Sequence, residues 1–177
     1  MTGPGGVTAR ARSQVSKITD SLGLFFTSSI KDILIQFTNE ETELRYGKQW
    51  APLDATELDA YLVTLLIQGV YHDGTVPISE LWRESDGKKI YQARIPQERF
   101  AQVTCSLRFN ENRARNERLK TDKMAHVREV FDLWSDRLRS SSFPYQHMCV
   151  DEQLFPFKGR CGFKQYIPTK PRSYYDL

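Results

Sequence analysis

One stretch decides how this sequence is interpreted: Val150-Asp-Glu-Gln-Leu-Phe-Pro-Phe-Lys-Gly-Arg-Cys-Gly-Phe-Lys-Gln-Tyr-Ile-Pro-Thr-Lys-Pro171. The residues around its start predict a β-strand, because Met148, Val150 and Leu154 recur on one face of an extended chain. Asp151 lies on the other face. A carboxylate inside such an apolar strand costs free energy unless a cation or a hydrogen-bond donor compensates it. The pattern therefore indicates that Asp151 has a partner.

A basic segment follows this strand. It contains no acid between Phe155 and Ser173, and its five cations are Lys158, Arg160, Lys164, Lys170 and Arg172. Aromatic residues are interleaved with these cations. A carboxylate beside such a segment is the arrangement of a metal-binding acid next to a phosphate-binding track. An ordinary strand followed by a solvated basic loop is the alternative, but it leaves the order of the residues unexplained.

The order of residues in this stretch resembles the piggyBac transposases and their domesticated relatives. The family pattern is Asp-Glu-Gln, then Phe-Lys/Arg-Gly-Arg, then an aromatic-rich run that ends in Tyr-Ile-Pro-x-Lys-Pro. The corresponding residues here are Asp151-Glu152-Gln153, Phe157-Lys158-Gly159-Arg160 and Tyr166-Ile167-Pro168-Thr169-Lys170-Pro171. The resemblance extends back to about residue 22, through Thr38-Asn39 and Trp50-Ala51-Pro52.

The resemblance implies a catalytic chemistry. Family members cut DNA with three carboxylates on an RNase H-like sheet that hold two divalent metal ions, implied to be Mg²⁺. By resemblance Asp151 is the first of these carboxylates and a metal ligand. Glu152 follows it directly and points to the opposite face of a strand, so it is poorly placed to share the same metal. A free-standing nuclease that uses Asp151 and Glu152 is the weakest of the hypotheses considered.

The other two family carboxylates lie well downstream of the first. This chain continues for 26 positions after Asp151, and Asp176 is the last acid in it. We therefore expect a fragment truncated within the catalytic domain, which does not catalyse alone or bind Mg²⁺ stably.

Composition limits the class of protein. The chain has 177 residues, of which 40% are hydrophobic and 12% aromatic, enough for a packed core. The net charge of +3 means that a nucleic-acid surface has to come from local clustering. Three cysteines without CxxC spacing favour a reducing compartment, and the histidines have no metal-ligand spacing. No apolar run approaches the ~20 residues that cross a bilayer. We expect a soluble intracellular protein, nuclear by family resemblance.

Hydrophobic periodicity predicts four long helices before the terminal strand. They start near Ser28 or Ser29, at Asp54, at Pro96 and at Asp122, and the last is expected to run to Leu138 with Trp134 turned inward. The second helix, apolar nearly all round, is expected to be buried. The family's Leu-His-Phe signature appears as Leu107-Arg108-Phe109, and the departure at Arg108 costs little if that position faces solvent or DNA.

The predicted fold class is mainly α: an N-terminal multi-helix domain, followed by the first strand or strands of an incomplete RNase H-like domain. Three parts are expected. Residues 1–21 form a flexible basic lead, which is either a plain tail or an arm that touches DNA. Residues 22–142 form a helical domain of the dimerisation or DNA-binding type. Residues 143–177 open the catalytic domain.

The predicted function is DNA binding associated with cut-and-paste transposition. The expected contacts are phosphates of the DNA backbone, bound by the five cations after Asp151 and by Arg113 and Arg115 in a polar linker. A solvated loop is the more common explanation of such linker cations, and phosphate contact is the alternative that the family resemblance favours. The alternative function is a domesticated helical interaction module that pairs with a full-length transposase. A second copy of the chain is a further possible partner, whereas no membrane and no small-molecule substrate is expected.

The count of carboxylates gives a first prediction. The purified 177-residue chain should not nick or join DNA with Mg²⁺ or Mn²⁺, because one of three required carboxylates cannot hold two divalent ions beside a phosphate. A plasmid-nicking assay checks this. Metal-dependent cleavage that Asp151→Ala abolishes would contradict it and favour the free-standing nuclease.

Overall fold

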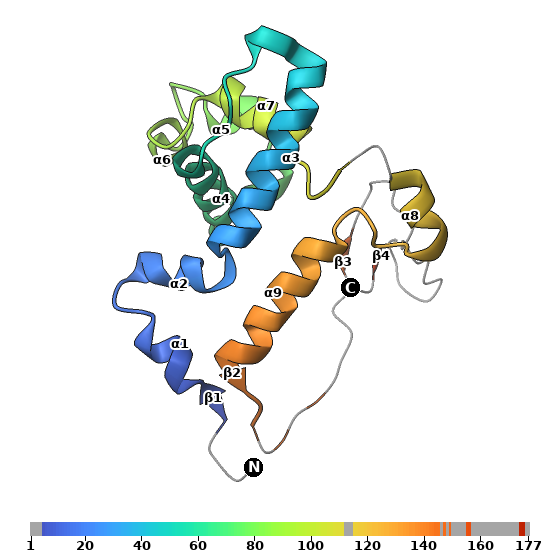
Figure 1. Cartoon of the computed structure of the whole chain (residues 1–177). Coiled ribbons are helices and arrows are strands. Elements are labelled where there is room, and N and C mark those ends of the chain that lie inside the picture. Colours follow the sequence, from blue (N-terminus) through green and yellow to red (C-terminus); the bar gives the residue numbers. More distant parts are fainter. Residues whose placement is uncertain are drawn as a thin grey trace. The chain divides into compact units, whose positions relative to one another are not determined.

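The computed structural model describes residues 5–111 and 115–145, together with residues 147, 149, 155–156 and 174–175. The chain is mainly helical, as predicted, and divides into two compact units (Figure 1). One unit is residues 28–111, called here the 28–111 unit. The other, called the terminal unit, combines the residues before Ser28 with those after Glu111. No helix in the described ranges is both long and apolar enough to cross a membrane.

The 28–111 unit is built from five α-helices and two 3-10 turns (Figure 1). Its elements are α3 (Ser28–Tyr46), η1 (Gly47–Gln49), α4 (Ala55–Val70), η2 (Asp73–Thr75), α5 (Ile78–Leu81), α6 (Lys89–Gln92) and α7 (Gln97–Ser106). The predicted start at Ser28 is confirmed. The buried stripe of α3 is Ile30, Leu34, Thr38 and Thr42, so two threonines extend the apolar face.

Helix α4 starts where the sequence predicts, because the Asp54 carboxylate accepts a hydrogen bond from the Glu57 amide at 2.8 Å. Its burial differs from the prediction. Leu58 and Tyr61 are buried, whereas Leu66 and Val70 are 53% and 75% exposed. The helix is therefore buried on one face only, and its apolar residues near the C-terminal end remain on the surface.

The core of the 28–111 unit is aromatic. The indole of Trp82 is 6% exposed and its Nε1–H donates to the Ile95 carbonyl at 2.8 Å. Its ring centroid lies 5.2 Å from that of Tyr91 and 4.9 Å from that of Phe100. Phe100 in turn lies 5.2 Å from Tyr61 of α4. These contacts connect α4, α6 and α7, and they place Trp82 in the core of the unit.

A buried carboxylate holds the loop after α4. Asp73 in η2 is 8% exposed and accepts hydrogen bonds from the Tyr91 hydroxyl, at 2.6 Å, and from the Lys88 ammonium. The Lys88 ammonium also lies over the ring of Tyr71, 4.3 Å from its centroid. These donors, Lys88 first, hold the pKa of Asp73 below its usual range. The loop is therefore tied to α6 by a satisfied carboxylate.

Arg108 does not face solvent or DNA. Its side chain is 18% exposed, and its guanidinium donates to a Glu41 carboxylate oxygen at 3.0 Å. Its backbone N–H donates to the hydroxyl of Thr38 at 3.0 Å. The condition under which the departure costs little is not met, because Glu41, one turn after Thr38 on α3, supplies an internal partner. Arg108 therefore ties the end of α7 to α3.

The terminal unit contains α1 (Ala9–Ser13), α2 (Ile18–Phe25), α8 (Arg115–Thr121) and α9 (Arg128–Ser141). Strand β1 (Gly6–Val7) pairs antiparallel with β2 (Ser142–Phe143). The residues expected to form a flexible lead thus contain β1 and α1. Gly5 packs against Tyr145, whose Cα would lie 2.5 Å from an added Cβ, so this position has no room for a side chain.

Helix α9 differs from the predicted helix at its start and in its burial. It begins at Arg128 and not at Asp122, and it contains no buried residue. Its apolar stripe of Phe131, Trp134 and Leu138 is 37–38% exposed, so the expectation that Trp134 points into a core is wrong. A wide apolar stripe predicts a helix correctly but does not establish that a partner covers it.

Of the predicted strand from Met148 to Phe155, the structure describes Cys149, which belongs to no strand, and Phe155; the second predicted strand, at Phe163–Ile167, lies outside the described residues. At Phe155, β3 (Phe155–Pro156) pairs antiparallel with β4 (Tyr174–Tyr175). The boundaries of the three expected domains stay a prediction.

The aromatic core leads to a stability prediction. Trp82→Ala should lower the free energy of unfolding by roughly 3–5 kcal/mol, because it removes a buried ring and orphans the Ile95 carbonyl. Leu66→Ala, a control on the exposed face of α4, should cost less than about 0.5 kcal/mol. Urea unfolding followed by far-ultraviolet circular dichroism measures both. Equal costs would contradict the assignment of Trp82 to the core.

Candidate nucleic-acid interface

Most of the predicted site residues lie outside the described part of the chain. These are Asp151, Arg113, Lys158, Arg160, Lys164, Lys170 and Arg172. Arg115 is described, and the structure places it in the first turn of α8, within the segment expected to be a linker. The geometry therefore tests neither the metal ligand nor the C-terminal phosphate track, and both stay predictions.

Arg115 is half-buried and forms no ion pair within the described part of the chain. Its Nε is buried without a hydrogen-bond partner there. Burial lowers the pKa of the nearby His126, and the positive charge of Arg115 lowers it further. Arg115 is thus a cation whose charge is not neutralised locally, as a phosphate contact requires.

The turn between α8 and α9 is fixed by a fork between Asp122 and Arg128. The guanidinium of Arg128 donates to both carboxylate oxygens of Asp122, each at 2.8 Å, and the Met124 amide donates to the same carboxylate at 2.9 Å. This fork, with Arg128 as the first cause, lowers the pKa of Asp122 to about 2. The three bonds explain why the chain turns at Asp122 instead of continuing as a helix.

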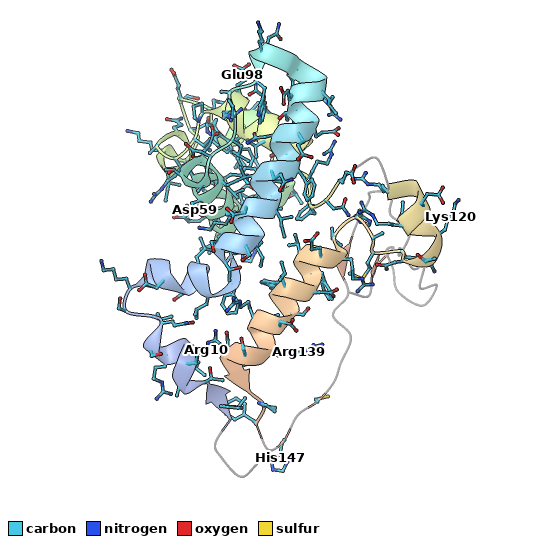
Figure 2. All side chains as sticks on the ribbon, in the orientation of Figure 1. Arg10, Asp59, Glu98, Lys120, Arg139 and His147 are labelled. Carbon is cyan, nitrogen blue, oxygen red and sulfur yellow. The ribbon has the colours of Figure 1, made fainter. Side chains whose placement is uncertain are left out.

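Several cations of the terminal unit are occupied by such ion pairs. Besides Arg128, Lys120 on α8 (Figure 2) lies 2.7 Å from Glu117, and Arg139 on α9 lies 3.5 Å from Asp136. Besides Arg115, the described cations of this unit that form no ion pair within the described ranges include Arg10, Arg12, Lys17, Lys123 and Arg137. The sequence indicated Arg10 and Arg12 only as part of the expected basic lead. It did not indicate Arg137 as a functional residue, because a single arginine in a helix is usually a solvated surface residue.

Charge is divided unequally between the two units. Residues 28–111 carry nine Lys and Arg against thirteen Asp and Glu, a net charge of −4. The rest of the chain carries sixteen against nine, a net charge of +7. A polyanion is attracted to the terminal unit and repelled by the 28–111 unit. This contrast is hidden in the overall charge of +3.

The resemblance implies Mg²⁺ and a ligand role for Asp151. Within the described ranges, no group of three or more His, Cys, Asp and Glu side chains is placed to hold a metal ion. Asp151 itself lies outside those ranges. The described donors therefore do not form such a site, and no step proposed below depends on a metal ion.

Comparison with known proteins identifies the class and then the family. A family described as Transposase IS4 matches residues 19–175, which makes the chain transposase-related. The chain belongs to the piggyBac-type transposase family. Its fold matches the cryo-EM structure of a piggyBac transposase synaptic complex with hairpin DNA, with a TM-score of 0.87 and 26% sequence identity. That match covers 98% of this chain and 37% of the matched chain, so this chain spans about a third of its length.

The Asp122–Arg128 fork leads to a prediction about pH. A carboxyl group whose pKa is lower in the folded than in the unfolded state stabilises the fold above its unfolded pKa of about 4. That stabilisation is lost as pH falls through the folded pKa, so the window runs from about pH 4 to pH 2. Asp122→Asn should reduce the melting temperature at neutral pH and make it less sensitive to acid in this window.

Thermal melts at several pH values measure the effect, with Asp132→Asn as the control. Asp132 also lies near Arg128, at 3.7 Å, but it is exposed, so its change should leave the acid sensitivity as in the unmodified chain. The acid sensitivity contributed by Asp73 is common to all three proteins. Identical pH profiles for Asp122→Asn and the unmodified chain would rule out the fork as a source of stability.

Proposed function

We propose that this chain binds duplex DNA through the phosphates of its backbone, as part of cut-and-paste transposition. The observation that supports this proposal is the division of charge, with +7 outside residues 28–111 and −4 within them. Phosphate contacts by Lys and Arg dominate the affinity of proteins for DNA, and a local positive field is sufficient to supply them. The matched transposase was solved in a complex with hairpin DNA, which adds support by similarity.

The contacts proposed for this function are the basic segment after Asp151 and the linker cations. The segment comprises Lys158, Arg160, Lys164, Lys170 and Arg172, with Arg113 and Arg115 from the linker. Such contacts position a protein on DNA without reading its sequence, so binding should show little sequence preference. The same proposal includes a nuclear location and an RNase H-like domain that opens at residue 143.

A second function is favoured by the exposed apolar stripe of α9. Phe131, Trp134 and Leu138 are each more than a third exposed, and aromatic residues of this kind are common at the centre of protein interfaces. In this alternative the chain is a helical module that pairs with a full-length transposase. The charge division does not support it, because an apolar interface does not require a basic unit.

Salt dependence distinguishes the two functions. If three to five cations meet phosphates, log affinity should fall with log salt with a slope of about −3 to −4.5. Changing Lys158 and Arg160 together to Ala should flatten the slope by about two units. The control is Lys48→Ala with Lys89→Ala, which removes two exposed cations without ion pairs from the acidic 28–111 unit and should leave the slope unchanged.

Electrophoretic titration of a duplex at several salt concentrations measures all three proteins. Absence of binding at low salt would end the DNA proposal. If the unmodified chain instead captures a purified full-length piggyBac transposase, the interaction-module function replaces the DNA-binding proposal.

A further inference from the structure

A small hollow lies between α1 and the C-terminal end of α9, both in the terminal unit. Its polar lining comes from Arg10 and Gln14 on one side and from Arg137, Ser140 and Ser141 on the other. Figure 2 shows Arg10 on α1 and Arg139 on the neighbouring part of α9. The two cations that line the hollow, Arg10 and Arg137, are more than 120 positions apart in the sequence.

The two sides of the hollow are held together by the backbone. The Thr8 amide donates to the Ser141 carbonyl at 2.9 Å, and the Thr8 hydroxyl donates to the Ser140 carbonyl at 2.9 Å. The same hydroxyl accepts from the Ala11 amide at 3.1 Å and so caps α1. With the β1–β2 pairing beside it, this arrangement fixes the start of α1 against the end of α9.

Among the residues that the structure describes, the hollow is lined by two cations and by no carboxylate. Neither Arg10 nor Arg137 forms an ion pair within the described part of the chain. The nearest acid along α9 is Asp136, and it pairs with Arg139 at 3.5 Å. Two guanidinium groups that line one hollow repel each other, and a bound anion relieves that repulsion. The hollow is therefore suited to an anionic ligand.

Phosphate fits the chemistry of this lining. A guanidinium presents its N–H donors as a planar fork that matches two phosphate oxygens, and the Gln14 amide and the Ser141 hydroxyl offer further donors. No aromatic side chain lines the hollow, so it offers no surface on which a base could stack. The contact is thus to the phosphate and not to the base.

We propose that Arg10 and Arg137 together bind one backbone phosphate of duplex DNA. This inference rests on the proposed function and adds a contact on the helical part of the terminal unit, separate from the segment after Asp151. Because Arg10 lies on α1 and Arg137 on α9, the contact requires both ends of the described terminal unit to be folded together.

Fluorescence anisotropy with a short labelled duplex, repeated at several salt concentrations, tests the proposal. Arg10→Gln with Arg137→Gln should weaken binding at low salt roughly tenfold or more, as expected for lost charge-assisted hydrogen bonds. It should flatten the log–log slope by about 0.9, the value for one phosphate. Arg10→Lys with Arg137→Lys, which keeps both charges, should retain most of the slope.

The matched control is Arg12→Gln with Lys123→Gln, which removes the same charge from two exposed cations of the terminal unit that lie outside the hollow and form no ion pair within the described ranges. It should change the slope much less than the hollow variant does. Equal changes in the two variants would overturn the proposal in favour of a diffuse positive field. Circular dichroism checks that each variant is folded. If the double variant of the hollow does not fold, the single variant Arg10→Gln, which changes an exposed position, is tested in its place.

The remaining outcomes separate this inference from the proposed function. If the unmodified chain binds DNA with a steep salt slope and the hollow variant binds equally well, the hollow inference is wrong and the proposed function stands. If the unmodified chain binds no DNA, both fail. Titration with inorganic phosphate, followed by the arginine Nε–H signals in NMR spectra, then shows whether the hollow binds a free anion instead.

Discussion

The side-chain amide of Asn39 is the interaction on which the 28–111 unit depends. Its oxygen accepts from the Trp50 indole at 3.0 Å and from the Leu53 amide at 2.7 Å, while its nitrogen donates to the Leu53 carbonyl at 2.9 Å. The Trp50 ring, fixed in this way, carries the guanidinium of Arg99 at 4.1 Å from its centroid. Arg99 in turn donates two hydrogen bonds to the Glu57 carboxylate, both at 2.6 Å. One amide therefore fixes α3 to the loop before α4, and through two further side chains it orients α4 and α7.

The parts of the fold that could be predicted from sequence are those set by local chemistry. Asp54 caps α4 because its carboxylate meets an amide three residues later, and Pro96 precedes α7 because a proline ring suits the start of a helix. The start of α9 was predicted too early, at Asp122. Asp122 and Arg128 are six residues apart, a spacing that does not put two side chains on one face of a helix, so the helical periodicity could not indicate their fork. The burial of Thr38 was missed because its hydroxyl is satisfied by the Arg108 amide, 70 positions away. Contacts between residues that are far apart in the sequence cannot be detected from a local hydrophobic pattern.

The candidate site was only partly predictable for a related reason. A run of cations without acids, as in residues 158–172, can be found in the sequence alone and indicates a phosphate track without any structure. The hollow beside α1 is not visible in that way, because Arg10 and Arg137 line it together only in the fold, in which β1 pairs with β2. Family resemblance does not supply it either, since the motifs that carry the resemblance lie elsewhere in the chain. Sequence reasoning therefore finds contiguous binding segments more readily than sites assembled by the fold.

The count of cations in a sequence also overstates the surface available to DNA. Arg99, Arg108 and Arg128 are each committed to a carboxylate of the same unit, namely Glu57, Glu41 and Asp122. A guanidinium held in this way is neutralised and oriented, so a phosphate would have to displace its partner before binding. Arg10 and Arg137, which form no such pair within the described part of the chain, lie in the terminal unit, whereas Arg99 and Arg108 of the acidic 28–111 unit are used internally. The division of charge and the pattern of ion pairs thus point to the same unit, because the carboxylates that stabilise the fold and the phosphates of a polyanion compete for the same cations.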